Sequence, residues 1–176
     1  VLISGSGSNL EAIAEACRTN KINGKIVCVI SNNPDAYGLK RAKKFNLQSV
    51  VIDHNSFASR TEFENKIESS LDSYDVDLIV LAGFMRILGE NITKKYFGKM
   101  INLHPSLLPK YPGLDTHKKV LQNGDAKHGI SIHYVTPELD AGPIIAQGAI
   151  NITRDDNIES IETVSYTHLT LPTMIG

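Results

Sequence analysis

The chain has 176 residues, of which 41% are hydrophobic and 21% are charged, and its formal net charge at pH 7 is -1. These values are typical of one globular domain with a sizeable core, and they argue against a disordered or coiled-coil chain. A nearly neutral chain is not drawn as a whole to nucleic acid or anionic membranes, and we expect neither a membrane helix nor a signal peptide, because no long apolar run or charged leader is visible.

The first half of the sequence alternates apolar strands with helices. From Leu10 to Cys17, apolar residues recur at the spacing of one helix face. Ser8 is the expected N-cap of this helix, with Glu11 as its capping-box partner. In chain order, strands are predicted at 1–4, 25–30, 49–52 and 77–82, and helices at 10–19, 36–45 and 61–71.

The second half begins with a short predicted strand at 100–103 and a helix at 117–122 that ends before Gly124. Two strands follow, at 129–135 and 143–150, and their connection is too short for a crossover helix. We therefore expect them to be antiparallel neighbours. Together with the earlier alternation, this predicts a Rossmann-like three-layer α/β fold whose mixed sheet is mostly parallel.

The two ends of the sequence stand apart from this pattern. The chain begins without Met, inside its first predicted strand, and residues 164–176 follow no period after a clean helix start near Asp156. We expect one catalytic domain over 1–163, truncated at both ends, and a non-native tail over 164–176. Cys17 and Cys28 are expected to be buried, reduced thiols, which favours a cytoplasmic setting.

A glycine-rich turn, Gly5-Ser6-Gly7-Ser8-Asn9, joins the first strand to the first helix. Glycines let the backbone approach a ligand closely, and the free N–H groups of a helix start attract anions. A purely structural turn is the simpler alternative. A nicotinamide site is disfavoured, because Leu10 replaces the third glycine of the dinucleotide motif and Asn32-Asn33 replace its acidic residue.

Three polar residues point to catalysis. Asn102 and His104 are two residues apart at the end of a strand, so their side chains should face one cleft while Leu103 packs on the opposite side. Asp140 lies before a Gly-Pro pair. Asp, His and Asn together can handle protons and bind an oxyanion, although each of them alone is more often structural. No metal is expected, because the histidines lack ligand spacing.

Four longer motifs together resemble the folate-dependent formyltransferase family, and the resemblance runs from the first residue to about Glu162. They are Ser4-Gly5-Ser6-Gly7-Ser8-Asn9-Leu10, Leu81-Ala82-Gly83-Phe84-Met85-Arg86-Ile87-Leu88, Asn102-Leu103-His104-Pro105-Ser106-Leu107-Leu108-Pro109-Lys110-Tyr111-Pro112-Gly113, and His128-Gly129 through Leu139-Asp140-Ala141-Gly142-Pro143. The continuation from Lys110 to His117 differs from the Arg-Gly-Ala-Ala-Pro type of the members that act on methionyl-tRNA.

The resemblance implies transfer of a formyl group from 10-formyltetrahydrofolate, a co-substrate, to the amine of glycinamide ribonucleotide in purine biosynthesis, by a monomer or weak homodimer. It implies oxyanion donors Asn102 and His104, with Asp140 holding the imidazolium. The substrate phosphate is expected at Gly7, Ser8 and Asn9, joined by Arg60. Folate is expected at Met85, Arg86, Ile87, Leu88, Asn102 and Asp140.

Two other functions stay open. A formyltetrahydrofolate hydrolase would use the same Asn-His-Asp set with water in place of the amine. A catalytically inactive phosphate-binding module is the second alternative, because Leu169-Thr170 stand about where the family's C-terminal helix carries a Glu-His pair.

Overall fold

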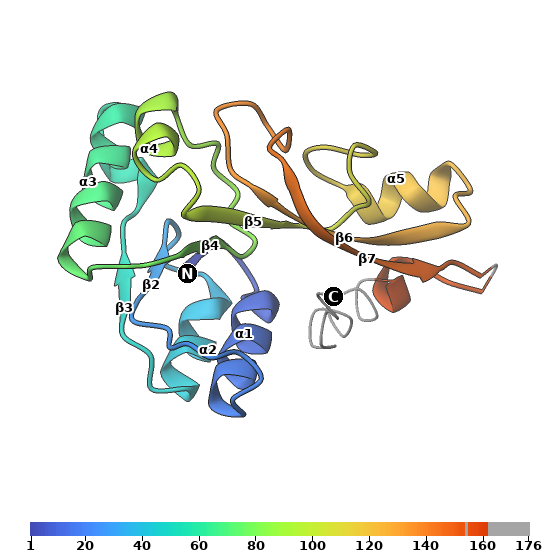
Figure 1. Cartoon of the computed structure of the whole chain (residues 1–176), viewed down its shortest axis with the longest axis horizontal. Helices are drawn as coiled ribbons and strands as arrows, with labels where there is room; N and C mark the ends of the chain where they lie inside the picture. The colour runs from blue at the N-terminus through green and yellow to red at the C-terminus, as the bar shows by residue number, and fades with distance from the viewer. Residues whose placement is uncertain (154, 162–176) are drawn as a thin grey trace.

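A computed structural model gives the structure of the chain, and it describes residues 1–153 and 155–161. The predicted non-native tail, the end of the predicted domain at residue 163 and the Leu169-Thr170 pair lie outside these residues. Two helical layers enclose one sheet, and the last two strands extend away from the main body with a further helix over them (Figure 1).

Seven strands form the sheet in the order β3-β2-β1-β4-β5-β6-β7. Strands β1 to β5 pair in parallel, and β6 pairs antiparallel with both β5 and β7. The predicted mixed sheet with late antiparallel strands is therefore confirmed. The strands are β1 Leu2–Ile3, β2 Val29–Ser31, β3 Ser49–Val51, β4 Ile79–Leu81, β5 Met100–His104, β6 Lys127–Tyr134 and β7 Ile144–Asn151.

Helices cover both faces of the parallel part of the sheet (Figure 1). Successive strand residues point to opposite faces, so Leu2 packs in the core beside α3 and α4, whereas Ile3 packs in the core beside α1 and α2. Both cores consist mainly of aliphatic side chains. The helices are α1 Ser8–Arg18, α2 Tyr37–Lys44, α3 Arg60–Ser73, α4 Glu90–Lys95 and α5 Thr116–Gln122, with a 3₁₀ turn at His54–Ser56.

Local structure departs from the predictions in two instructive places. Gly7, not Ser8, is the N-cap of α1, and it adopts a left-handed conformation with φ 73°. The predicted capping box is therefore wrong: Ser8 is already helical, and Glu11 pairs with Arg41 and Lys44 of α2. Helix α4 was not predicted, because its six residues are too few to display an apolar period.

The strand order places three functional segments at one edge of the sheet. The carboxyl ends of β1, β4 and β5 are neighbours, and they lead into the glycine turn, the segment 82–89 and the proline-rich loop 105–115. Ligands of open α/β sheets bind at this edge. None of the helices in the described part of the chain has the length and apolar character needed to cross a bilayer.

Candidate active site

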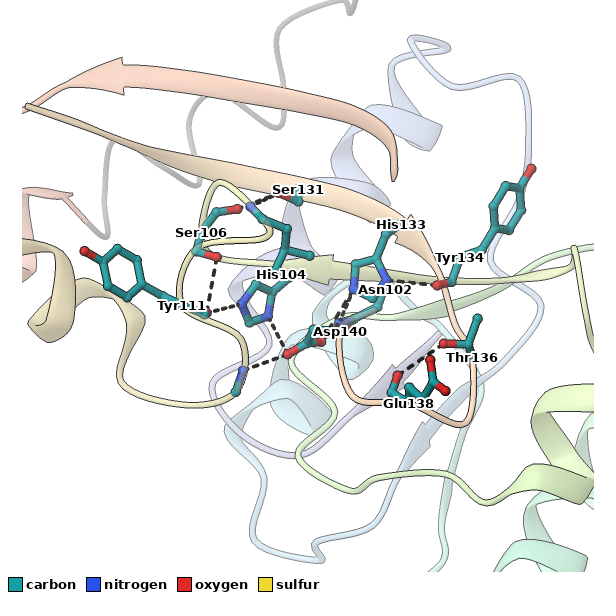
Figure 2. A network of polar contacts seen from close by, with 12 residues as sticks. Asn102, His104, Ser106, Tyr111, Ser131, His133, Tyr134, Thr136, Glu138 and Asp140 are labelled. Carbon is teal, nitrogen blue, oxygen red and sulfur yellow. Dashed lines mark hydrogen bonds and ion pairs between the residues drawn. The ribbon is translucent and has the colours of Figure 1, made fainter. Parts of the chain in front are cut away.

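Asp140 is the centre of a buried polar network at the end of β5 (Figure 2). Its Oδ2 lies 3.3 Å from His104 Nδ1, and the two side chains are only 7% and 5% exposed. Its Oδ1 accepts a hydrogen bond from Asn102 Nδ2 (3.2 Å). The structure thus brings together the three predicted catalytic residues, two from β5 and one from the loop between β6 and β7.

Both ring nitrogens of His104 face acceptors. Nε2 lies 2.8 Å from the backbone carbonyl of Tyr111, which can only accept, so Nε2 carries a proton. Nδ1 faces the carboxylate of Asp140, and an unprotonated nitrogen there would be repelled by it. Both nitrogens of the ring are therefore directed at acceptors.

His133 fixes the orientation of Asn102. These residues are direct partners across the β5–β6 ladder. His133 Nδ1 donates to the Tyr134 carbonyl (2.9 Å), and its Nε2 lies 3.1 Å from Asn102 Nδ2 and 3.5 Å from Asp140 Oδ1. Asn102 Nδ2 therefore lies between His133 Nε2 and Asp140 Oδ1, and exchanging it with the amide oxygen would turn that oxygen toward a carboxylate.

The Asp140 carboxyl is held in its ionised form. Burial by itself would raise the pKa of Asp140, but the hydrogen bonds from His133 and from the Gly113 N–H, together with the charge of His104, outweigh burial and lower it below the ordinary value. The Gly113 N–H donates to Oδ2 at 2.8 Å. Asp140 therefore acts as an acceptor and as a negative charge beside the imidazole.

The loop after β5 is fastened to the sheet by hydroxyl groups. The Ser106 hydroxyl donates to the Lys110 carbonyl (2.6 Å), and the Ser131 hydroxyl donates to the Ser106 carbonyl (2.6 Å). Ser131 Oγ also accepts from the Leu108 N–H at 3.0 Å. These bonds fix the path of the chain to Tyr111, whose carbonyl holds His104 (Figure 2).

The glycine turn is shaped as an anion site. The carbonyls of Gly5 and Ser6 accept from the Gly38 N–H and from Arg41 Nε, both at 3.0 Å. A peptide N–H points opposite to the preceding carbonyl, so the N–H groups of Ser6 and Gly7 point away from α2. Within the described chain neither of them has an acceptor, and the buried Oδ1 of Asn9 has no partner either.

A cavity of about 470 Å³ lies beside the segment expected to contact folate. Met85, Arg86 and Ile87 line it together with Arg60, whereas Gly7, Ser8 and Asn9 do not. The structure thus groups Arg60 with the 85–88 segment and not with the glycine turn. A smaller adjoining cavity of about 70 Å³ is lined by Arg86, Ile87 and Leu88 as well as Asn102 and Asp140.

Sequence reasoning missed three groups that complete the network: His133, the Tyr111 carbonyl and the Gly113 N–H. Only His133 left a usable signal, because His133 and Ser131 are polar residues that alternate with Ile130 and Ile132. Within residues 1–153 and 155–161, no three His, Cys, Asp or Glu side chains are grouped so that they could hold a metal ion.

Comparison with known proteins identifies the family. The formyl transferase family model matches residues 1–168. The chain is 48% identical over 161 residues to phosphoribosylglycinamide formyltransferase of Escherichia coli, covering 92% of this chain and 76% of the relative. It is 39% identical over 161 residues to the human trifunctional purine biosynthetic protein adenosine-3, covering 92% of this chain and 16% of that protein.

Solved structures agree with this result. The phosphoribosylglycinamide formyltransferase of Coxiella burnetii superposes with a TM-score of 0.92 at 48% identity, covering 98% of this chain and 81% of that one. Glycinamide ribonucleotide transformylase 1 of Geobacillus kaustophilus gives a TM-score of 0.91 at 33% identity, covering 98% and 93%. This chain therefore belongs to the formyl transferase family, among relatives that are phosphoribosylglycinamide formyltransferases.

Proposed function

We propose that this protein transfers the formyl group of 10-formyltetrahydrofolate to the primary amine of glycinamide ribonucleotide. The observation that carries the proposal is the buried Asp140 carboxylate, which holds both His104 and Asn102 beside a cavity shared with Arg86, Ile87 and Leu88. The partners are then two small molecules, and we expect the reaction to take place in the cytoplasm.

The glycine turn supplies the site for the ribonucleotide phosphate. Outward-pointing N–H groups of Ser6 and Gly7 and the start of the 11-residue helix α1 offer donors to an anion. We assign Gly7, Ser8 and Asn9 as phosphate contacts. The nucleophile is the substrate amine, and with a pKa near ~8 a useful part of it is uncharged at neutral pH.

Attack by the amine on the formyl carbon produces a tetrahedral oxyanion. His104 Nδ1–H and Asn102 Nδ2–H are assigned as its donors. Both are directed at Asp140 over 3.3 and 3.2 Å, at the long end for such bonds, so an incoming oxyanion can share them. A cationic imidazole adds charge stabilisation to the hydrogen bond.

Asp140 keeps these donors in place and takes part in proton movement. The attacking amine must lose a proton, and the folate nitrogen must gain one before the carbon–nitrogen bond breaks. An ionised carboxylate between the two donors can accept the amine proton through water and return it toward the leaving nitrogen.

The folate is assigned to the two adjoining cavities. Met85 and Ile87 provide apolar walls, and the backbone of 85–88 can pair with the edge of the pterin ring. We assign Arg60 to this ligand and not to the phosphate, because it lines the larger cavity with Arg86, and guanidinium groups pair well with the carboxylates that folates carry.

An assay with three arms tests the function. Chromatography follows the release of tetrahydrofolate in three mixtures. The first contains 10-formyltetrahydrofolate alone, the second adds glycinamide ribonucleotide, and the third adds both glycinamide ribonucleotide and excess inorganic phosphate. We expect release that depends on the amine substrate and is slowed by phosphate. Release with folate alone would instead indicate the hydrolase, and no release in any arm would indicate the inactive binding module.

A further inference from the structure

In the segment Met85–Leu88, the side chains of Met85, Arg86 and Ile87 are exposed, whereas Leu88 packs in the core. The segment lies between β4 and α4 and belongs to no strand or helix. Met85 is 65% exposed and Ile87 is 55% exposed. The three exposed side chains contribute little packing of their own, so contacts to the backbone help to set the shape of the segment.

One such contact holds the beginning of the segment. The Met85 N–H donates to Ser4 Oγ at 2.7 Å, and the Ser4 hydroxyl in turn donates to Asn32 Oδ1 at 2.5 Å. Ser4 and Asn32 are both buried. Asn32 occupies the place where dinucleotide-binding folds carry their acidic residue, and here its side chain is used internally to orient Ser4.

A second contact holds the end of the segment. The Gly89 N–H donates to Glu64 Oε1 at 2.7 Å, and Arg60 Nε donates to the same oxygen at 2.7 Å. Glu64 projects from α3 and is buried. The Glu64 carboxylate also lies close to the Gly89 backbone, because a Cβ on Gly89 would lie 2.7 Å from Glu64 Oε2.

We propose that Ser4 and Glu64 are positioning residues for the folate site, which hold the two ends of the 85–88 segment so that its backbone and side chains keep the shape the ligand needs. The proposal rests on the proposed function for the identity of the ligand. Neither residue is assigned a contact with the reacting atoms.

Removing either acceptor should weaken folate binding selectively. A partly buried N–H that loses its acceptor favours a backbone rearrangement toward water, which moves the segment away from the shape that the ligand needs. We expect Glu64→Ala and Ser4→Ala each to raise the KM for 10-formyltetrahydrofolate about tenfold while kcat changes less than about threefold.

Glu64→Gln separates the two bonds that Glu64 accepts. The amide oxygen can still accept from the Gly89 N–H, whereas the charge that pairs with Arg60 is lost. We expect an increase in folate KM of about threefold, between that of the wild type and that of Glu64→Ala. Glu68→Gln is the matched control, because Glu68 lies one turn further along α3 and pairs with Lys95 instead.

The experiment measures steady-state kinetics for each substrate, together with amide hydrogen exchange at Met85 and Gly89 in the free protein. Support is a rise in folate KM with little change in the KM of the amine substrate, and faster exchange at Gly89 in Glu64→Ala and at Met85 in Ser4→Ala. Unchanged folate KM values in both alanine variants, or an equal rise for both substrates, would overturn the proposal. If the wild-type protein transfers no formyl group, the proposed function is overturned instead. Hydrogen exchange would then still test the two backbone contacts, from Met85 to Ser4 and from Gly89 to Glu64.

Discussion

The polar network around Asp140 and the glycine turn lie at the same edge of the sheet but differ in how their polar groups are satisfied. Around Asp140, every carboxylate oxygen and imidazole nitrogen of the Asn102–His104–His133 group faces a partner. In the glycine turn, the N–H groups of Ser6 and Gly7 and the buried Oδ1 of Asn9 have none among the described residues.

This difference indicates what each region is suited to bind. A saturated network is rigid before the ligand arrives, which suits donors that must be in place when charge develops in the transition state. The N–H groups of Ser6 and Gly7 are donors from which a bound anion can accept, so anion binding there supplies partners that the free protein lacks. Mutations should therefore affect turnover in the first region and affinity in the second.

The largest effects are expected in the saturated network. Asn102→Ala and His104→Ala each remove an assigned oxyanion donor, and Asp140→Asn removes the charge that both donors face. We expect kcat to fall about 10²–10³-fold in each, with circular dichroism unchanged. Steady-state kinetics check this, and turnover near that of the wild type in all three variants would contradict the assignment.

Gly7→Ala tests the turn by steric means. A Cβ at Gly7 would lie 2.4 Å from Gly38 Cα, and the φ of 73° is strained for alanine in any case. The substitution should push α1 from α2 and distort the anion site, raising the KM of the amine substrate by at least about tenfold and lowering the free energy of unfolding by about 2–3 kcal/mol.

Gly124→Ala is the control for this experiment. Gly124 also has a positive φ, 64°, but no atom lies within 4 Å of the position its Cβ would take. It should show only the conformational strain, about 1 kcal/mol, with both KM values unchanged. Equal effects of the two substitutions would mean that strain alone, and not the contact with Gly38, shapes the turn.

The same contrast explains how far the sequence could be interpreted. Strand alternation and strand-end spacing placed Asn102 and His104 on one side and Leu103 on the other, because these depend only on backbone periodicity. Motif resemblance pointed to Asp140. The bonds from the Tyr111 carbonyl and the Gly113 N–H leave no trace in residue identity, since any residue has a carbonyl and nearly any has an N–H. Cross-strand pairing of His133 with Asn102 depends on a register that sequence alone does not give.

The buried side chain of His128, on β6, predicts that stability depends on pH. Burial, followed by the charges of His117 and His104, lowers the pKa of His128 to about 4, against the opposing pull of Asp125. His128 Nδ1 has no partner in the described structure. In the unfolded chain His128 has its ordinary pKa of 6.5, so between pH 6.5 and 4 it binds a proton that it does not bind in the folded protein.

The stabilising contribution of neutral His128 is therefore complete above about pH 6.5 and declines as the pH falls toward 4. Between pH 6.5 and 5, about 1.6 kcal/mol of unfolding free energy should be lost through this residue. Urea unfolding at both pH values, for the wild type and for His128→Gln, isolates the contribution of His128 to the unfolding free energy. The variant should lose correspondingly less stability over this interval, and an identical pH dependence in the two proteins would contradict the prediction.

The smallest effect on stability is expected at Asn9, where the substitution removes a buried acceptor that has no partner among the described residues. Because Asn9 Oδ1 is buried without a partner, Asn9→Ala removes an unsatisfied group and should leave the free energy of unfolding unchanged or raise it by up to about 1 kcal/mol. The KM of the amine substrate should nevertheless rise several-fold. Asn33→Ala provides the opposite case, since Asn33 Oδ1 accepts from the Asp35 N–H at 3.0 Å and its loss should destabilise by about 1 kcal/mol. If thermal unfolding shows both substitutions to be equally destabilising, Asn9 Oδ1 has a hydrogen-bond partner in the free protein, and the contrast with Asn33 is lost.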